Sequence, residues 1–206
     1  MRKSGILLPI SSLPSAYGIG CFSQEAYEWV DFLKEAGQSC WQILPLGPIG
    51  YGDSPYQSFS SFAGNPYYIS LEKLISYGWL TEEECESVDW GADERYVDYG
   101  LLYENRSVLL RKAFQKSGIE DDPQFRKFQE EEKDWLGDFA LFMALKDENE
   151  GKPWTLWEED VKYRKEEVLK DKANELAQEI CYYEFLQFEF YRQWLELKNY
   201  ANSQGV

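Results

Sequence analysis

The chain has 206 residues, and 44% of them are hydrophobic, which is enough for a sizeable core. A formal net charge of −16 argues against nucleic acid and anionic membranes as partners, because both are bound through Lys and Arg. The four cysteines lie far apart and there is no histidine, so we expect reduced thiols and no metal site. No apolar run approaches the ~20 residues of a membrane span and no signal peptide is visible, so a cytoplasmic protein is expected.

The charge is unevenly distributed. Residues 1–78 hold 4 Lys and Arg against 6 Asp and Glu, whereas residues 79–206 hold 17 against 31. This shift predicts a domain boundary near Gly78. The glutamate runs at 82–84, 130–132 and 158–159 lack the Asp/Asn/Gly spacing of a calcium loop, so they indicate solvated helix faces.

The N-terminal part predicts a strand, a helix and a second strand. Residues 5–10 and 40–44 are short apolar runs typical of fully buried strands. Between them, Ser23 can cap a helix whose apolar residues keep a helical period up to Gly37. Strand, helix and strand within about 40 residues indicate a βαβ unit with parallel strands. The loops that follow the two strands, 11–22 and 45–68, should therefore meet at one edge of the sheet.

The second of these loops is far longer than a connector requires. Its stretch 50–68 reads GYGDSPYQSFSSFAGNPYY, with six aromatic residues among small polar ones and neither a helical nor a strand period. Aromatic rings offer faces on which the C–H groups of sugars stack, and short polar side chains pair with sugar hydroxyls. The stretch is typical of a carbohydrate-recognition loop, while a long ordered loop whose aromatics only pin it to the core stays an alternative.

From residue 69 onward the pattern is helical. Residues 69–75 predict a short helix stopped by Gly78, and Thr81 with Glu84 forms a capping box at the start of the next helix. Further helices are expected at 103–116, at 123–131 with Asp122 as cap, at 135–146, and from about 166 to 202. The last helix should pack in the core through one face, made of Leu176, Ile180, Tyr183, Gln187, Tyr191 and Trp194 and widened by Phe185, Phe188 and Leu195.

Five stretches distributed along the chain carry a family resemblance. They read GILLPISSLPS at 5–15, WQILPLGP at 41–48, GYGDSPYQSFSSFAGNPYYISL at 50–71, VDYGLLYENR at 97–106 and FALFMALKD at 139–147. Together they resemble the N-terminal part of a 4-alpha-glucanotransferase, a family also called amylomaltase or disproportionating enzyme. The resemblance covers essentially the whole chain, and the block at 50–67 is its most specific part.

The resemblance implies an α/β fold, namely the N-terminal part of a (β/α)8 TIM barrel with its first two strands and a largely helical inserted subdomain. Residues 1–78 would begin the barrel and carry the long substrate loop 45–68, and residues 79–206 would form the acidic helical insertion. The implied activity is the transfer of α-1,4-glucan segments between malto-oligosaccharides by a retaining double displacement, which needs two carboxyl groups and neither cofactor nor metal. The family's nucleophilic Asp, acid/base Glu and third Asp are expected beyond Val206, so no catalytic residue is expected in this chain.

What the resemblance assigns to this chain is substrate binding. Tyr56 should stack on or border the −1 sugar, with Asp53, Ser54 and Gln57 shaping that end of the cleft. Two further aromatics match a second glucan-binding site that some members possess. They are Tyr51 and Tyr103, although Tyr103 could equally pack into the core from its helix.

Two strands of eight cannot close a barrel, so residues 1–78 should be marginally stable alone. The expected partners are malto-oligosaccharides, other α-1,4-glucans and the missing C-terminal part of the barrel. Two alternatives stay open. The chain could be a glucan-binding module without chemistry, or an acidic helical interaction protein in which residues 79–206 are the functional part.

Overall fold

The computed structural model describes residues 2–50, 52–93 and 95–206. The chain forms two compact units, one made of Met1–Ser117 with Glu189–Val206 and the other of Gly118–Phe188. The domain boundary predicted near Gly78 was based on the distribution of charge and on which residues the family resemblance assigns to the barrel. The division into compact units is a different criterion, so this boundary stays a prediction. Among the described residues, no helix is both long and apolar enough to cross a membrane.

The first unit begins with the predicted βαβ arrangement, in which β1 (Gly5–Leu7) pairs in parallel with β2 (Cys40–Gln42). The register places Ile6 opposite Trp41. Both strands are shorter than expected and neither is fully buried, since Leu7 is 53% exposed. Pro9 lacks a backbone N–H, and the chain turns there into the 3-10 helix η1 (Ile10–Ser12), which ends the first strand early.

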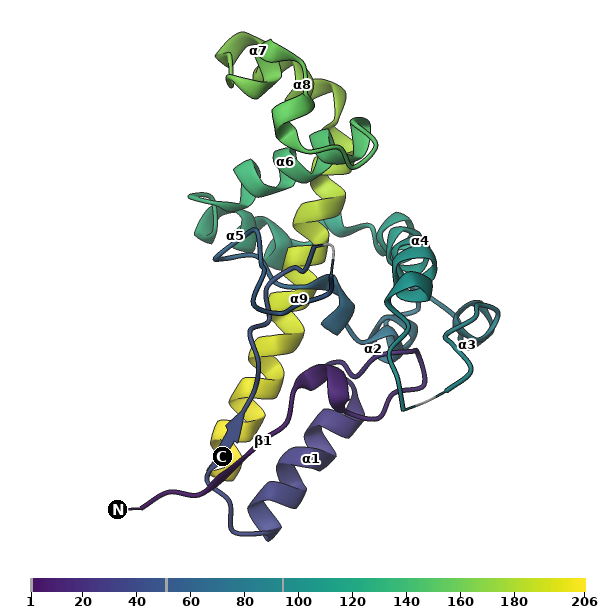
Figure 1. The fold of residues 1–206 in the computed structure, drawn as a ribbon, viewed down its shortest axis with the longest axis vertical. Coiled ribbons are helices and arrows are strands. Elements are labelled where there is room, and N and C mark those ends of the chain that lie inside the picture. Colours follow the sequence, from purple (N-terminus) through teal and green to yellow (C-terminus); the bar gives the residue numbers. More distant parts are fainter. Residues whose placement is uncertain (1, 51, 94) are drawn as a thin grey trace. The chain divides into compact units, whose positions relative to one another are not determined.

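Helix α1 (Gln24–Glu35) connects the two strands (Figure 1), and its Trp29 ring lies with its centroid 6.4 Å from that of Trp41 in β2. Ser23 occupies the N-cap position, and Gly37 ends the helix with a φ of 67°, a conformation that suits glycine. The helix buries Ala26, Val30 and Leu33, which are spaced three and four residues apart as the sequence indicates.

The polypeptide then forms three helices in the first unit. Ser70 caps α2 (Leu71–Ser76), and the predicted capping box is present at α3 (Glu82–Glu86). There the Glu84 amide donates to Thr81 Oγ1 over 3.2 Å, and the Thr81 amide donates to the Glu84 carboxylate over 3.0 Å. Helix α4 (Tyr99–Ser117) starts four residues earlier than predicted, because the Asp98 carboxylate accepts the Leu101 amide and caps it.

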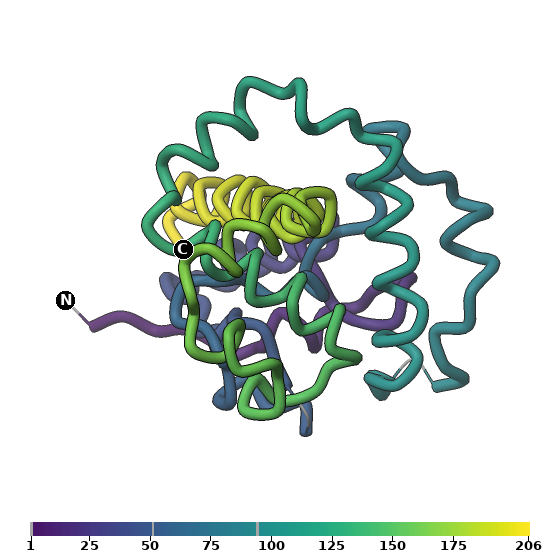
Figure 2. Tube along the Cα trace, turned by 90° about the horizontal axis from the view of Figure 1, so that it is seen from above, coloured from purple at the N-terminus to yellow at the C-terminus, as the bar shows by residue number. Residues whose placement is uncertain are grey.

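The long helix α9 (Ala177–Gln204) begins in the second unit and ends in the first, and the tube in Figure 2 follows it as one unbroken coil. Its C-terminal part packs on α1, where the Tyr200 hydroxyl donates to Asp31 over 2.6 Å. The predicted apolar face is only partly correct. Leu195 is 48% exposed, whereas Leu186, Phe190 and Leu197 are buried.

The second unit contains η3 (Ile119–Asp121), α5 (Pro123–Glu131), α6 (Leu136–Glu148), η4 (Trp154–Leu156), α7 (Glu159–Lys162) and α8 (Glu166–Glu175). Asp122 caps α5 as predicted. The single helix expected from about 166 to 202 is instead interrupted between α8 and α9 at Leu176. No Gly or Pro marks this break, and Leu176 turns to pack against a small core of Leu145, Trp157 and Val161.

Candidate functional site

A cavity of about 200 Å³ lies where the chain leaves the two parallel strands. Because β1 and β2 run in the same direction, the segments that follow them emerge at one edge of the sheet. One wall comes from the loop after β1, a second from the loop after β2, and a third from the first turn of α4. The residues that line the cavity are Ser11, Ile19, Leu44, Ile49, Asp53, Pro55, Asn65, Tyr68 and Tyr99.

One backbone hydrogen bond connects the two loops at this cavity, and a second joins the two ends of the long loop. The Phe22 amide donates to the Tyr68 carbonyl over 3.0 Å, and the Asn65 amide donates to the Leu46 carbonyl over 2.8 Å. The Asn65 side chain is buried and accepts the Tyr67 amide over 3.0 Å. The end of the long loop is therefore held by fixed hydrogen bonds, which is the preorganisation that a binding site needs.

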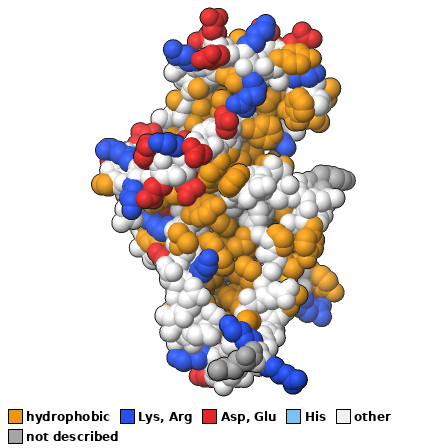
Figure 3. Space-filling view, turned by 90° about the vertical axis from the view of Figure 1, so that its left-hand side faces the viewer, with side chains coloured by type: hydrophobic (Ala, Val, Ile, Leu, Met, Phe, Trp, Pro, Cys, Tyr) orange, Lys and Arg blue, Asp and Glu red, His pale blue; other side chains and the backbone are white. Residues whose placement is uncertain are grey.

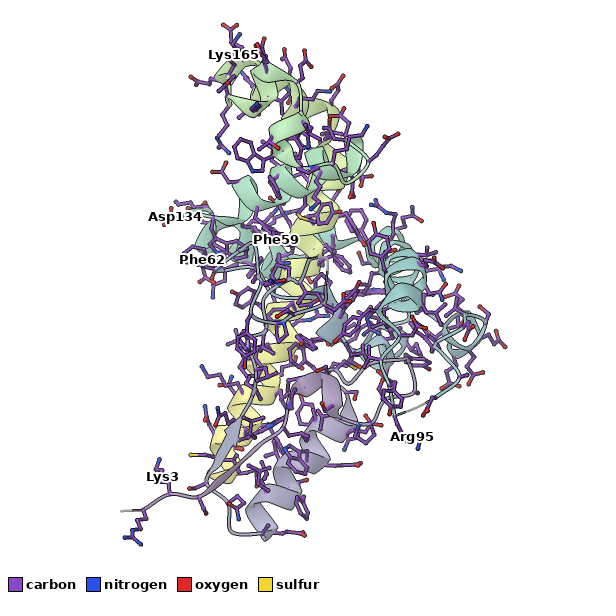
Figure 4. All side chains as sticks on the ribbon, in the orientation of Figure 1. Lys3, Phe59, Phe62, Arg95, Asp134 and Lys165 are labelled. Atoms are coloured by element: carbon purple, nitrogen blue, oxygen red, sulfur yellow. The ribbon has the colours of Figure 1, made fainter. Side chains whose placement is uncertain are left out.

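The C-terminal part of α9 supports the middle of the same loop. The Tyr191 hydroxyl donates to the Phe62 carbonyl over 2.5 Å, and Gly64 lies against the Phe190 ring. Phe59 and Phe62, labelled in Figure 4, project from this part of the loop and are 44% and 62% exposed. The loop thus presents aromatic side chains to solvent while its backbone is anchored to a helix.

We expect Gly64→Ala to lower the free energy of unfolding by about 1–3 kcal/mol, because a Cβ at this position would lie 2.1 Å from the Phe190 ring. Urea denaturation followed by tryptophan fluorescence measures this change. Gly50→Ala in the same loop is the matched control, since a Cβ there meets nothing within 4 Å. Equal stability of the two variants would show that the loop does not depend on its contact with α9.

At the site, several tyrosine side chains are buried or partly buried, two of them near the carboxylate of Asp53, and this raises their pKa values. Burial, reinforced by the nearby Asp53 charge, raises the pKa of Tyr67 to about 12, and the same two causes in the same order raise the pKa of Tyr99. Burial also raises the pKa of Tyr68 to about 12, with a side-chain hydrogen bond from Ser11 acting in the opposite direction. At neutral pH these tyrosines are therefore protonated and able to donate hydrogen bonds, and Asp53 offers acceptors. This combination suits a ligand rich in hydroxyl groups.

Of the predicted substrate-binding residues, Asp53 lines the cavity and the others lie on the adjoining turn. Asp53 adopts a left-handed conformation with a φ of 54°, which is uncommon for a residue with a side chain and concentrates at functional sites. Ser54 organises the turn, because its hydroxyl accepts the Tyr56 amide over 3.4 Å and its carbonyl accepts the Gln57 amide over 3.1 Å. Tyr56 itself is 73% exposed, with its ring available to solvent.

The two residues predicted for a second glucan site have different outcomes. Tyr51 lies outside the described residues. Tyr103 is 75% exposed on α4, so it does not belong to the core of this chain. It lies one turn after Tyr99, and residues at this spacing share a face of a helix. Its role in glucan binding stays a prediction.

Sequence reasoning missed several residues that line the cavity, namely Ser11, Asn65, Tyr68 and Tyr99. Tyr99 carried a usable signal, because it precedes Tyr103 by four residues in the stretch VDYGLLYENR. Among residues 2–50, 52–93 and 95–206, no group of three His, Cys, Asp or Glu side chains is placed to hold a metal ion.

Arg106, at the end of the same stretch, was also missed, and it joins the elements around the site. Its side chain is fully buried and donates to two backbone carbonyls, from Nη1 to Tyr17 over 3.2 Å and from Nη2 to Ile69 over 2.5 Å. Tyr17 belongs to the loop after β1, and Ile69 directly follows the long loop. Burial lowers the pKa of Arg106, with the nearby Cys21 and Glu72 acting in the opposite direction.

Comparison with known proteins identifies the family. Residues 8–206 match the family model described as 4-alpha-glucanotransferase. A 4-alpha-glucanotransferase of Clostridium butyricum is 48% identical over 197 residues, covering 96% of this chain and 40% of the relative. One from Thermus thermophilus is 46% identical, covering all of this chain and 41% of the relative. The chain thus spans about 40% of the length of the curated relatives it matches.

Solved structures give the same result. The amylomaltase from Streptococcus agalactiae, determined in complex with acarbose, superposes with a TM-score of 0.95 at 41% sequence identity. The match covers all of this chain and 42% of that enzyme. The amylomaltase from Corynebacterium glutamicum, at 20% identity and a TM-score of 0.74, shares the fold. The chain therefore belongs to the 4-alpha-glucanotransferase family.

Proposed function

We propose that this chain is the substrate-binding N-terminal portion of a 4-alpha-glucanotransferase, which transfers α-1,4-glucan segments between malto-oligosaccharides. The observation that carries the proposal is the cavity at the edge where both parallel strands end, in a chain that belongs to this family. In folds built from parallel strands and helices, ligands bind beyond the carboxyl ends of the strands.

The cavity offers binding groups rather than a catalytic pair. A retaining double displacement needs two carboxyl groups about 5–5.5 Å apart, one as nucleophile and one as acid and base. Among the described residues that line the cavity, Asp53 is the only carboxylate. The nucleophilic Asp, the acid/base Glu and a third Asp would therefore come from sequence beyond Val206 of the complete enzyme.

Within this division of labour, Tyr56 would border the −1 sugar, and Asp53, Ser54 and Gln57 would shape that end of the cleft. The exposed ring of Tyr56 and the Ser54-centred turn that carries it support this role. Tyr51 and Tyr103 would contact a glucan chain at a second site. The 75% exposure of Tyr103 supports this assignment, because its ring is available for stacking.

The complete protein would close the two strands into a (β/α)8 barrel. Both strands are edges of a two-stranded sheet, and Leu7 of β1 is 53% exposed. Hydrophobic side chains also reach the surface over much of the face shown in Figure 3. Open strand edges and exposed apolar side chains favour docking of further strands and helices.

The test is the disproportionation of maltotriose, followed by glucose release and by the ladder of longer maltodextrins. We expect no transfer by the 206-residue chain alone, and transfer when a polypeptide supplying the remaining barrel strands is added. Transfer by the chain alone would place the catalytic carboxylates within these residues. Binding of maltodextrin without transfer in the complemented system would favour a glucan-binding module.

In the complemented system, Tyr56→Ala should reduce kcat/KM for maltotriose about tenfold, because it removes an aromatic face from the −1 sugar. Tyr96→Ala is the matched control, since Tyr96 is 74% exposed against 73% for Tyr56 but does not belong to the loop. Equal activity of the two variants would remove Tyr56 from the substrate site.

A further inference from the structure

The second unit contains a separate cavity of about 370 Å³ with an apolar floor. The floor includes Phe142 of α6 together with Trp157 and Val161, which belong to the small core of this unit. Trp157 is held in place, because its indole N–H donates to the Lys152 carbonyl over 3.0 Å. A hydrogen bond thus fixes the orientation of the Trp157 ring at the base of the cavity, and the cavity is large enough for a sugar ring or two.

The rim of the cavity differs from its floor because it combines one exposed indole with one ion pair. Trp154 lines the cavity from η4 and is 52% exposed, whereas Trp157, three residues later, is buried. Across the rim, Arg164 Nη2 lies 2.8 Å from Asp138 Oδ1. An exposed flat ring beside paired guanidinium and carboxylate groups offers both a stacking face and hydrogen bonds in both directions.

The backbone that presents Arg164 is unusual. Arg164 has a φ of 55° in the turn between α7 and α8, next to Lys165, which Figure 4 labels. Helices commonly end in this left-handed conformation at a glycine, and a side chain there costs about 1 kcal/mol. Arg164 thus lines the cavity from a backbone conformation that suits glycine better than arginine.

We propose that this cavity binds a glucosyl unit of an α-1,4-glucan, with the C–H face of the sugar on Trp154 and its hydroxyls on the Asp138–Arg164 pair. The choice of a glucan rests on the proposed function, whereas the cavity and its chemistry do not. Such a site would hold a long glucan chain at a point separate from the loop 45–68.

The charges at the rim favour a neutral polar ligand over the alternatives. An anion would approach the Asp138 carboxylate and would compete with it for Arg164. Lys162 also lines the cavity, but its ammonium lies over the Tyr163 ring, 5.6 Å from the centroid. A purely apolar ligand would take water away from the ion pair without replacing its hydrogen bonds. Sugar hydroxyls both donate and accept, so they replace those hydrogen bonds without bringing a further charge to the ion pair.

The experiment is a titration of the 206-residue chain, labelled with 5-fluorotryptophan, with maltopentaose while the ¹⁹F NMR spectrum is recorded. The Trp154 resonance is assigned from its loss in Trp154→Phe. We expect this resonance to shift with millimolar maltopentaose, both in the wild type and in Tyr56→Ala. A Trp154 resonance that does not move, or that moves with benzoate but not with maltopentaose, overturns the proposal.

Substitutions separate binding from folding. Arg164→Gly should weaken maltopentaose binding about tenfold, as expected for losing hydrogen bonds to a charged group, while the variant unfolds at the same or a higher urea concentration than wild type. Leu156→Ala is the control, because Leu156 lies in the same short helix as Trp154, is 71% exposed and does not line the cavity. If Leu156→Ala weakens binding as much as Arg164→Gly, the cavity is not the binding site.

The two proposals fail in different ways. Absence of maltotriose transfer in the complemented system, with the Trp154 shift intact, would contradict the proposed function and leave the glucan site supported. Transfer activity with no Trp154 shift would contradict the glucan site alone. The remaining tryptophan resonances report whether each variant is folded.

Discussion

Arg106→Met should lower the free energy of unfolding of this chain by about 3–5 kcal/mol. Methionine retains the unbranched stem but has no donor, so the Tyr17 and Ile69 carbonyls would lose the hydrogen bonds they now receive from the guanidinium. A buried carbonyl without a donor costs about 1–3 kcal/mol, and removal of the head group leaves an additional void. Urea denaturation monitored by tryptophan fluorescence measures the change.

Arg126→Met is the matched control for this variant. Arg126 also donates to a backbone carbonyl, from Nε and Nη2 to Glu120, but its side chain is 61% exposed, so water can replace the arginine. We expect Arg126→Met to lower the free energy of unfolding by less than about 1 kcal/mol. Similar losses in the two variants would mean that burial of Arg106 is not what makes its hydrogen bonds important.

The functional consequence of Arg106→Met should appear at the long loop 45–68. The guanidinium joins the loop after β1 to the residue that directly follows the long loop. In the complemented enzyme we expect a higher KM for maltotriose in Arg106→Met. The measurement is made without urea, at a temperature at which the variant is folded. Arg106→Lys retains the charge and one donor position, so its stability should lie between that of the wild type and that of the methionine variant.

The second large effect concerns Glu189, a fully buried carboxylate on α9. Burial raises its pKa from 4.5 to about 7, although the Arg192 guanidinium and a hydrogen bond from Gln193 act in the opposite direction. Arg192 Nη2 lies 2.7 Å from one carboxylate oxygen and 2.8 Å from the other, but only the second contact has hydrogen-bond geometry. The ion pair therefore compensates the cost of burial only in part.

A raised pKa in the folded state means that the folded protein binds this proton more tightly than the unfolded chain does. The resulting stabilisation is fully present below about pH 4.5 and is lost as the pH rises to about 7. We expect Glu189→Gln to abolish this component, so the stability difference between variant and wild type should grow in favour of the variant by up to about 3 kcal/mol over that range. Urea denaturation at a series of pH values measures the difference.

Glu196→Gln makes the same change in net charge on the same helix, at a side chain that is 50% exposed in its pair with Lys73, and it also removes a charge that raises the pKa of Glu189. Surface pairs of this kind contribute at most about 1 kcal/mol. A difference between Glu189→Gln and wild type that does not change between pH 4.5 and 7 would show that Glu189 does not titrate as its burial indicates.

Several features of this protein follow from the sequence by itself, because they depend on residues close together in the chain. The capping box of Thr81 and Glu84, the cap of α5 at Asp122 and the stop of α1 at Gly37 are interactions within a single turn of helix. The parallel pairing of β1 and β2 follows from one helix between two short apolar runs. The family resemblance follows from motifs such as the one at 50–71, each of which is a continuous stretch of sequence.

Other features were decided by contacts between residues far apart in the sequence. Local composition does not show that Arg106 would be buried against two loops, or that Glu189 would be buried on α9, because both residues are charged in stretches that read as ordinary helix. The interruption of the long helix at Leu176 likewise depends on the small core against which Leu176 packs. The helical period along a sequence determines which residues share a face, but tertiary packing determines which face is covered.

In the candidate site, too, some features depend on one stretch of sequence and others on long-range packing. The sequence by itself predicts that a loop rich in aromatic and small polar residues follows the second strand, because composition and resemblance to the family are properties of a continuous stretch. Only the tertiary structure brought Asp53 together with Asn65, Tyr68 and Tyr99 around one cavity, and only it left Trp154 exposed beside the Asp138–Arg164 pair. A cavity is the space between segments that long-range packing brings near each other, so no single stretch of sequence can specify it.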